Sequence, residues 1–214
     1  MGTVIRSATA ADVAQILAFI RALAVYERAP DAVSATEEGL LRDGFGPNPF
    51  YTCLIADHDG KPAGFALYFF NYSTWMGRPG IYLEDLFVYP ELRGLGIGKA
   101  LLQQVALAAL EKGCRRLQWE VLDWNTPAID FYRAMGAEFL DEWRNVRLGG
   151  EAIARLAEGG SRSASPSASA PKSPGKAPEP VEHELSAPFF RRSPGERVGE
   201  PASQPSSANE ETAS

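Results

Sequence analysis

The sequence predicts an α/β fold, a mixed central sheet flanked by helices, from the order of its apolar segments. Residues 50–56 and 63–72 are rich in β-branched and aromatic residues, and the short polar stretch between them contains Asp59-Gly60, which is typical of a hairpin turn. The later strand-like segments are separated by helix-like ones, which indicates crossover connections. The predicted order, β-α-α-β-β-β-α-β-α-β, therefore combines antiparallel and parallel strand pairs.

The N-terminal part is predicted to contain one strand and two helices. Residues 3–6 form the strand, and Thr9 with Asp12 resembles a capping box at the start of the first helix. Thr36 caps a second, shorter helix that ends at Gly44. The first helix runs to about Glu27, because its apolar residues recur at helical spacing: Val13, Ile16, Leu17, Ile20 and Leu23.

The rest of the domain is predicted to alternate strands with helices. Residues 81–88 form a strand that Pro90 ends, since proline cannot donate to a sheet ladder. A glycine-rich loop then opens a helix that ends near Gly113. The remaining expected elements are a strand at 116–122, a helix at 127–135, a strand at 139–148 and a short helix at 151–158.

The amino-acid composition of the chain changes at Gly159. From there on it is rich in serine, alanine and proline and lacks apolar periodicity, so it cannot bury enough surface to offset chain entropy. We predict a domain at residues 1–158 and a disordered Ser/Pro/Ala-rich tail at residues 159–214. Within the tail, the sequence Ala-Pro-Phe-Phe-Arg-Arg at 187–192 is either a docking motif for a partner or a tolerated apolar remnant.

Composition narrows the classes of function. The formal net charge of −6 gives no basic surface for nucleic acid. We expect a cytoplasmic protein without membrane association, because there is no charged-then-apolar leader and no long apolar run. The only histidines, His58 and His183, argue against a Ser-His-Asp triad or a histidine-rich metal site, so no metal is expected. Cys53 and Cys114 are expected to be reduced core thiols.

The glycine-rich loop at residues 93–98 is the strongest functional signal. Glycine amides next to a helix N-terminus favour an anion, usually a phosphate. A Walker-type loop is excluded, because Lys99 is followed by Ala100 instead of serine or threonine. A dinucleotide fingerprint is excluded as well, since its third glycine position is occupied by Lys99. The pattern that remains is Arg-x-x-Gly-x-Gly, at Arg93, Gly96 and Gly98.

This pattern resembles the acetyl-CoA pyrophosphate loop of the GNAT superfamily of N-acetyltransferases. Over residues 1–157 the chain resembles one subfamily more specifically, the diamine (spermidine/spermine) N1-acetyltransferases, which include thialysine acetyltransferases. The motifs that carry this likeness are Tyr26-Glu27, Asp-Gly-Phe-Gly at 43–46, Pro-Phe-Tyr at 49–51, Trp75-x-Gly77, Tyr-Leu-Glu-Asp at 82–85, Trp-Asn-x-Pro at 124–127, Phe131-Tyr132 and Gly136-Ala137.

The resemblance implies a GNAT fold, a homodimer, and acetyl-CoA as the cosubstrate. Main-chain groups of the strand at 81–88 would meet the pantetheine, the loop would hold the pyrophosphate, and residues 125–128 would lie along the other side. The residues expected to bind acetyl-CoA are Leu86, Phe87, Val88, Arg93, Gly94, Leu95, Gly96, Ile97, Gly98, Asn125, Thr126, Pro127 and Ala128.

The implied reaction is direct attack of a neutral amine on the thioester. Tyr132 matches the tyrosine that protonates the departing thiol in the family, and Glu84 matches the residue that meets the substrate amine and passes its proton out through water. Strand alternation places the neighbouring Asp85 on the opposite face, where we expect a structural role. These assignments make Tyr132 and Glu84 the expected catalytic residues.

Acidic side chains select cations, so we expect the acceptor to be a small di- or polyamine. The residues expected to bind it are Tyr26, Glu27, Trp75, Glu84, Trp119 and Glu142. One alternative acceptor is thialysine or another lysine analogue, whose carboxylate would need an arginine such as Arg28 or Arg144. An alternative of another class is a non-catalytic acetyl-CoA or polyamine binding module that docks partners through its tail.

Overall fold

The computed structural model describes residues 2–159. Met1 and residues 160–214, which include all of the predicted tail except Gly159, lie outside the described residues. The chain divides into two units, Met1–Arg144 and Asn145–Ser214, and each is described by itself. The first unit contains the sheet and both helical layers.

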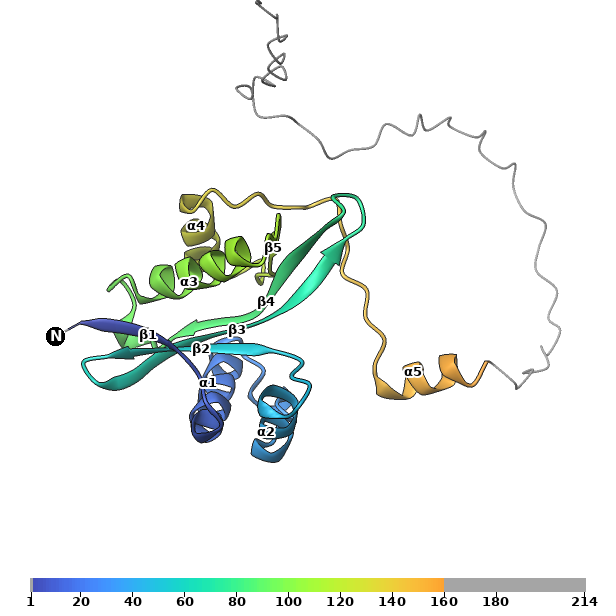
Figure 1. The fold of residues 1–214 in the computed structure, drawn as a ribbon, viewed down its shortest axis with the longest axis horizontal. Coiled ribbons are helices and arrows are strands. Elements are labelled where there is room, and N and C mark those ends of the chain that lie inside the picture. Colours follow the sequence, from blue (N-terminus) through green and yellow to red (C-terminus); the bar gives the residue numbers. More distant parts are fainter. Residues whose placement is uncertain (1, 160–214) are drawn as a thin grey trace, which may run out of the picture. The chain divides into compact units, whose positions relative to one another are not determined.

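The sheet is mixed, and its strand order follows the sequence (Figure 1). The first four strands pair antiparallel and the fifth joins the fourth in parallel. This confirms the predicted α/β class, with a hairpin between β2 and β3 and one crossover connection between β4 and β5 in the described residues. The strands are β1 (Thr3–Ser7), β2 (Thr52–His58), β3 (Lys61–Ser73), β4 (Arg78–Val88) and β5 (Leu117–Gln118).

Helices cover both faces of the sheet (Figure 1). One face carries α1 (Val13–Tyr26) and α2 (Glu37–Phe45), and the other carries α3 (Ile97–Glu111) and α4 (Thr126–Ala134). Each layer has its own core, because alternate strand residues point to opposite faces. Phe19 of α1 is fully buried and stacks on Phe65 of β3 with ring centroids 5.3 Å apart. On the other face, Leu101 and Val105 of α3 are fully buried.

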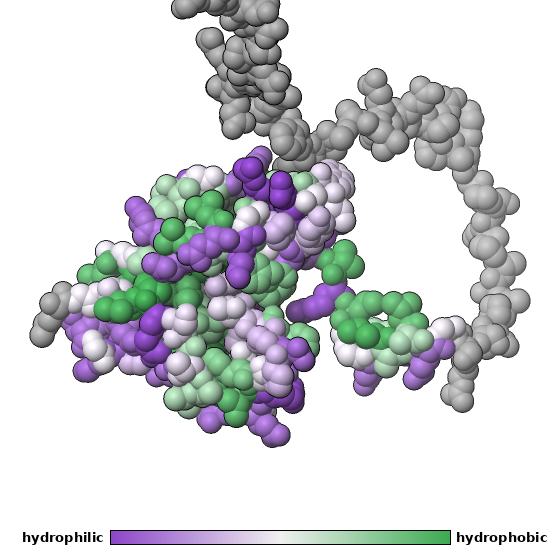
Figure 2. Space-filling view, in the orientation of Figure 1, coloured by the Kyte–Doolittle hydropathy of each residue, from purple (hydrophilic) through white to green (hydrophobic). Residues whose placement is uncertain are grey.

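Three 3-10 helices complete the first unit, and one α-helix belongs to the second. The short helices are η1 (Ala10–Asp12), η2 (Pro30–Ala32) and η3 (Pro90–Leu92). In the second unit, α5 (Gly150–Ala157) has an ion pair of 3.6 Å between Arg155 and Glu151, one turn apart. Figure 2 shows hydrophobic residues on one side of α5 and hydrophilic residues on another.

Two predicted strands differ from the structure. The strand expected at 116–122 is reduced to Leu117–Gln118, and no strand forms at 139–148 within the described residues. The alternation in that last segment is interrupted by the adjacent acids Asp141 and Glu142, and a strand also needs a neighbour to satisfy its backbone. The prediction for the cysteines is confirmed, because both are buried and unlinked.

An ion-pair network fixes the start of α1 to the sheet. Arg6 of β1 donates from its two Nη atoms to the carboxylate of Asp12 at 2.9 and 2.8 Å, and from Nε to Asp57 of β2 at 2.7 Å. Asp12 also accepts a 2.8 Å hydrogen bond from the backbone of Thr9, which confirms the predicted capping box. The hydrogen bonds from Arg6, and then those from Thr9, hold the pKa of Asp12 well below its usual range.

Asp12→Asn should lower the free energy of unfolding at pH 7 by about 1–2 kcal/mol, because it removes the charge from a partly exposed, doubly hydrogen-bonded pair. The depressed pKa of Asp12 gives stability that is present above the unfolded pKa of about 4 and is lost as the pH falls through the folded pKa. The two proteins should therefore approach each other in stability as the pH drops below about 4, which denaturant titrations at a series of pH values will measure.

Asp31→Asn is the matched control, since Asp31 is exposed and lies in η2 away from the network. It should change the stability by less than about 0.5 kcal/mol. A loss at Asp12 that stays constant down to strongly acidic pH would contradict an electrostatic role.

Candidate active site

β4 loses its neighbour on one side partway along its length (Figure 1). β5 pairs with it only through Ile81 with Leu117 and Tyr82 with Gln118, so residues 83–88 have no strand beside them on that edge in the described part of the chain. An unpaired edge offers N–H and C=O groups to an extended ligand. Three of the predicted cofactor-binding residues lie along it: Leu86, Phe87 and Val88.

The glycine loop follows this edge directly and leads into α3. Gly94 and Gly96 have φ angles of 82° and 80°, a left-handed backbone that glycine adopts without strain. Gly96 caps α3 without a side-chain hydrogen bond, so the N–H groups of the first turn remain available to an anion. Leu95 is exposed, whereas Ile97 is buried in the core and anchors the loop. This backbone geometry is compatible with an anion, and phosphate binding by the loop stays a prediction.

Arg93 turns back onto the strand and onto α1. Its Nε donates to the carbonyl oxygen of Val88 at 3.1 Å, and its guanidinium lies 4.1 Å from the ring centroid of Tyr26. The hydroxyl of Tyr26 in turn donates to Oδ1 of Asn125 at 2.9 Å. Tyr26 thus joins the two loops that flank the open edge of β4. It lies with the predicted cofactor-binding residues, although the sequence suggested contact with the acceptor.

Asn125 marks the second side of the open edge. It is buried and caps α4. Its main-chain carbonyl accepts hydrogen bonds from the N–H groups of Ala128 and Ile129, both at 3.0 Å. Thr126 and Pro127 form the exposed first turn, where the fixed φ of proline suits a helix start. The four residues predicted from 125–128 therefore form one short, rigid start of helix opposite the glycine loop.

A β-bulge corrects the prediction for Asp85. Leu67 of β3 pairs with Asp85, and the next residue Tyr68 pairs with Leu83, so Glu84 is an extra residue without a partner. Leu83 packs in the core under α3, but Phe87 packs under α1, which shows that the alternation changes at this point. Both acids therefore lie toward the α1 face, and simple strand alternation was wrong in separating them.

The charges of Asp85, Glu84 and Glu27 interact. Burial first, and then the negative charges of Glu84 and Glu27, raise the pKa of Asp85 to about 7. Partial burial also raises the pKa of Glu27, which directly follows α1. In the described residues no basic side chain forms an ion pair with any of the three. The cluster is thus a region of uncompensated negative charge, which favours a cationic ligand.

Tyr132 of α4 is buried near this acidic cluster. Burial first, and then the charge of Glu27, raise its pKa to about 12. Its ring packs against Trp119, with centroids 5.0 Å apart, and against Phe131 at 5.3 Å. Trp119, predicted to contact the acceptor, therefore supports the tyrosine. A phenol with this pKa remains protonated at neutral pH and is available as an acid.

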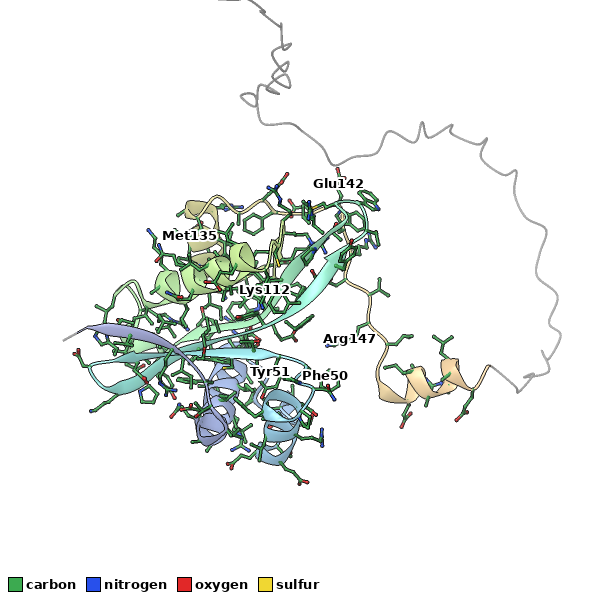
Figure 3. The ribbon with its side chains drawn as sticks, in the orientation of Figure 1. Phe50, Tyr51, Lys112, Met135, Glu142 and Arg147 are labelled. Atoms are coloured by element: carbon green, nitrogen blue, oxygen red, sulfur yellow. The ribbon has the colours of Figure 1, made fainter. Side chains whose placement is uncertain are left out.

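The structure does not bring Trp75 and Glu142 to the cluster. Trp75 lies 70% exposed in the turn between β3 and β4, and among the described residues it makes no aromatic contact or hydrogen bond with Glu27, Glu84 or Tyr132. Glu142 lies on the loop after α4, on the side of the sheet that carries α3 and α4 (Figure 3). The assignment of these two residues to the acceptor site has no support from the single chain.

A separate surface hollow of about 470 Å³ lies between α2 and the start of β2, where Figure 3 labels Phe50 and Tyr51. Its walls include Thr36, Leu40 and Asp43, and the carboxylate of Asp43 is already paired with Arg42 at 2.7 Å. None of the predicted catalytic or cofactor residues lines it. The geometry of the open strand edge, and not the size of a hollow, therefore identifies the candidate site.

Two kinds of feature are not found in the described part of the chain. Residues 2–159 contain no cluster of histidine, cysteine and acidic side chains able to hold a metal ion. No helix within the same residues is long and apolar enough to cross a membrane.

Comparisons with known proteins identify relatives of this chain. The sequence pattern of the Acetyltransferase (GNAT) family matches residues 15–137. The chain is 49% identical over 164 residues to thialysine N-epsilon-acetyltransferase of Bos taurus, covering 72% of this chain and 96% of that protein. It is 38% identical over 163 residues to human spermidine/spermine N(1)-acetyltransferase-like protein 1, covering 72% of this chain and 23% of that protein.

The fold has a counterpart among solved structures. An integron cassette protein from the mobile metagenome of V. cholerae superposes with a TM-score of 0.62 at 27% sequence identity, covering 74% of this chain and 99% of that one. The open edge of β4, the glycine loop that opens α3 and the matching sequence pattern thus converge, and this chain belongs to the acetyltransferase (GNAT) family.

Proposed function

We propose that the chain transfers the acetyl group of acetyl-CoA to a primary amine of a small cationic molecule, by direct attack of the neutral amine on the thioester. The observation that carries this proposal is the position of the acidic cluster. Glu27, Glu84 and Asp85 interact at the open edge of β4, and the charge of Glu27 also acts on the buried phenol of Tyr132. Bound acetyl-CoA supplies an activated acetyl group, and the residues around the edge hold it in place.

The chain offers contacts for the pantetheine arm and the pyrophosphate of acetyl-CoA. Backbone groups of 86–88 meet the amides of the pantetheine arm, as a strand edge meets an added strand. The amides at Gly96–Gly98 and the start of α3 meet the pyrophosphate. The start of α4 at Asn125 closes the other side, and Tyr26 connects it to Arg93. These features support acetyl-CoA as the donor, and the proposal includes no metal.

The acidic cluster serves the acceptor in two ways. Its negative charge attracts an ammonium group, but it also raises the pKa of the bound amine and so opposes the deprotonation that attack requires. A nearby base resolves this conflict. Asp85, with its pKa near 7, is better matched to proton uptake at neutral pH than an ordinary carboxylate, and Glu84 beside it links the cluster to solvent. We assign proton uptake to this pair.

Tyr132 holds the proton for the other half of the reaction. Its raised pKa keeps the phenol protonated until a strong base, the departing thiolate, forms beside it. Trp119 and Phe131 both pack against the ring, which limits the freedom of its hydroxyl to turn away. The non-catalytic binding module is disfavoured, because family membership and this arrangement of acid and base both fit an enzyme.

The proposal extends to assembly and location. We propose a homodimer, because the segment at 139–148 has no strand partner among residues 2–159 and Trp143 in it is 62% exposed. Apolar residues also lie in small patches over the face of the first unit in Figure 2. We propose that the protein acts in the cytoplasm, and that the residues beyond the described part are dispensable for catalysis.

Replacing the phenol of Tyr132 tests its role as the acid. Tyr132→Phe should reduce kcat by about 10²- to 10⁴-fold, because a positioned general acid contributes about that much. The KM for acetyl-CoA should stay nearly constant. Tyr68→Phe, which removes a hydroxyl from another buried tyrosine in the core, is the control and should retain turnover. Equal turnover in wild type and Tyr132→Phe would remove this residue from the mechanism.

The pH profile tests the proton-accepting pair. The kcat/KM of the wild type should rise with pH through about 7, where Asp85 loses its proton. Asp85→Asn should remove this limb, whereas Glu84→Gln should retain it with a lower plateau. Loss of the limb in Glu84→Gln alone would make Glu84 the base, as the sequence predicted.

The Asp85→Asn variant should also change the pH dependence of stability, and the direction of the change follows from the pKa of Asp85. The folded pKa of Asp85 lies above the unfolded value, so its contribution to stability is fully present below about pH 4 and is lost as the pH rises through about 7. Asp85→Asn should therefore gain stability relative to wild type as the pH rises from 4 to 8, by about 1–3 kcal/mol. Melting temperatures over this range will measure it, and a constant difference would show that Asp85 does not titrate as described.

The acceptor is tested with a panel of amines and acetyl-CoA, by following release of the free thiol. We expect activity on one or more of five small amines and little activity on a basic peptide. The five are putrescine, spermidine, spermine, lysine and thialysine. Strong activity on the basic peptide alone would contradict the small-molecule assignment. No release with any amine, although acetyl-CoA binds, would overturn the proposed function.

A further inference from the structure

The segment that follows β5 has little regular pairing with the sheet. β5 ends at Gln118, and residues 119–124 belong to no helix or strand. One side chain of this segment is nevertheless bound to β4, because the hydroxyl of Tyr82 donates to Oε1 of Glu120 at 2.7 Å. In the described part of the chain this is the only side-chain hydrogen bond between residues 119–124 and the sheet. It is therefore the specific link that holds this segment to β4.

The donor of this hydrogen bond, Tyr82, is itself held in place. Leu83 points into the core under α3, so strand alternation directs the neighbouring Tyr82 to the other face of the sheet. There its ring stacks on that of Phe69 in β3, with centroids 5.3 Å apart and planes 26° apart. Burial first, then the hydrogen bond to Glu120, and then the charges of Glu120 and Glu84 raise the pKa of Tyr82. The phenol therefore remains a hydrogen-bond donor at neutral pH.

Trp119 connects this hydrogen bond to the proposed acid. It directly precedes Glu120 and packs against the core on the side of α3. Its ring contacts that of Tyr132, with centroids 5.0 Å apart and planes 57° apart. Because Glu120 is bound on one face of the sheet and Trp119 packs on the other, the hydrogen bond to Tyr82 also limits how far the indole ring can move. A series of contacts thus runs from β4 to the phenol of Tyr132.

We propose that Glu120 is a positioning residue, which Tyr82 holds in place so that Trp119 keeps the hydroxyl of Tyr132 aligned with the departing thiolate. This inference rests on the proposed function and adds Tyr82 and Glu120 to the residues on which the reaction depends. Glu120 acts through its neighbours and does not meet the reacting atoms. Such support matters, because a displacement of a catalytic group by about 1 Å can reduce a rate by about 100-fold.

Two substitutions separate the hydrogen bond of Glu120 from its charge. Glu120→Gln keeps a carbonyl oxygen that accepts from Tyr82, whereas Glu120→Ala removes the acceptor as well. Release of free thiol is measured with acetyl-CoA and the most active of putrescine, spermidine, spermine, lysine and thialysine. Glu120→Ala should reduce kcat by about 10- to 100-fold and leave the KM for acetyl-CoA nearly constant. Glu120→Gln should retain most of the wild-type kcat, and an equal loss in both variants would overturn the inference.

Double-mutant cycles test the route from Glu120 to Tyr132. Tyr82→Phe removes the donor but keeps the ring on Phe69, so it should lower kcat as much as Glu120→Ala does. The two substitutions together should lose no more than either alone. In a Tyr132→Phe background, Glu120→Ala should cause little further loss, because the hydroxyl that it positions is absent. Independent losses that multiply in either cycle would overturn the inference.

Tyr51→Phe is the matched control. It also removes a tyrosine hydroxyl, which donates to the carbonyl oxygen of Leu40 at 2.8 Å and lies at the hollow beside α2. This variant should keep the wild-type kcat. Melting temperatures will show that each variant is folded, and Glu120 is exposed, so its replacement leaves the core intact. Should Glu120→Ala fail to fold, Tyr82→Phe tests the same hydrogen bond from the other side.

Failure of this inference can be distinguished from failure of the proposed function. A wild type that releases no thiol with any of the five amines overturns both. An active wild type whose folded Glu120→Ala and Tyr82→Phe variants keep the wild-type kcat overturns the inference alone. A higher KM for the amine in Glu120→Ala, with kcat unchanged, would assign the carboxylate to binding of the acceptor and would also overturn the inference.

Discussion

The candidate site depends on the interruption of regular pairing in β4. On one edge the strand loses β5 after Tyr82, and against β3 the extra residue Glu84 changes the alternation of its side chains. The first feature leaves backbone groups available to a ligand, and the second turns two adjacent acids toward the same face. A regular strand would have a paired edge and would direct Glu84 and Asp85 to opposite faces. The proposed donor and acceptor sites therefore depend on these two features of β4.

The end of α1 connects the two halves of this site. Tyr26 bridges the glycine loop and the start of α4, the charge of Glu27 acts on Asp85 and Tyr132, and Arg28 places a cation over Trp124. Of these three consecutive residues, Tyr26 contacts both loops beside the open edge, Glu27 belongs to the acidic cluster, and Arg28 lies over Trp124. The ion pairs of Arg6 fix the opposite end of the same helix to the sheet. The helix acts as a rigid support for functional groups at its C-terminal end.

The sequence predicts the parts of the fold that depend on local pattern. The first two helices with their caps, the hairpin, the glycine loop and the helix after it are all present near the expected residues. The segment at 139–148 shows the limit of this reasoning, because its strand pattern alone provides no neighbouring edge. The domain boundary and the tail stay predictions, since residues 160–214 lie outside the described part.

The site was predictable to the extent that its residues belong to motifs. Resemblance indicates Arg93 to Gly98, Asn125 and Tyr132. In the structure Tyr26 connects Arg93 with Asn125, and Tyr132 packs against Trp119. The role of Asp85 was not predictable, because no residue type marks a bulge. Trp75 and Glu142 were assigned to the acceptor site because of their residue types, but in the structure they are not joined to the acidic cluster.

The most direct test of this account is amide hydrogen exchange of the full chain with and without acetyl-CoA. We predict that binding protects those amides of residues 83–88 that are not bonded to β3, together with the amides of Gly96–Lys99 in the first turn of α3. The amides that pair β1 with β2 should exchange as before. Protection confined to other parts of the chain, with the open edge of β4 unchanged, would contradict the central role given to that edge.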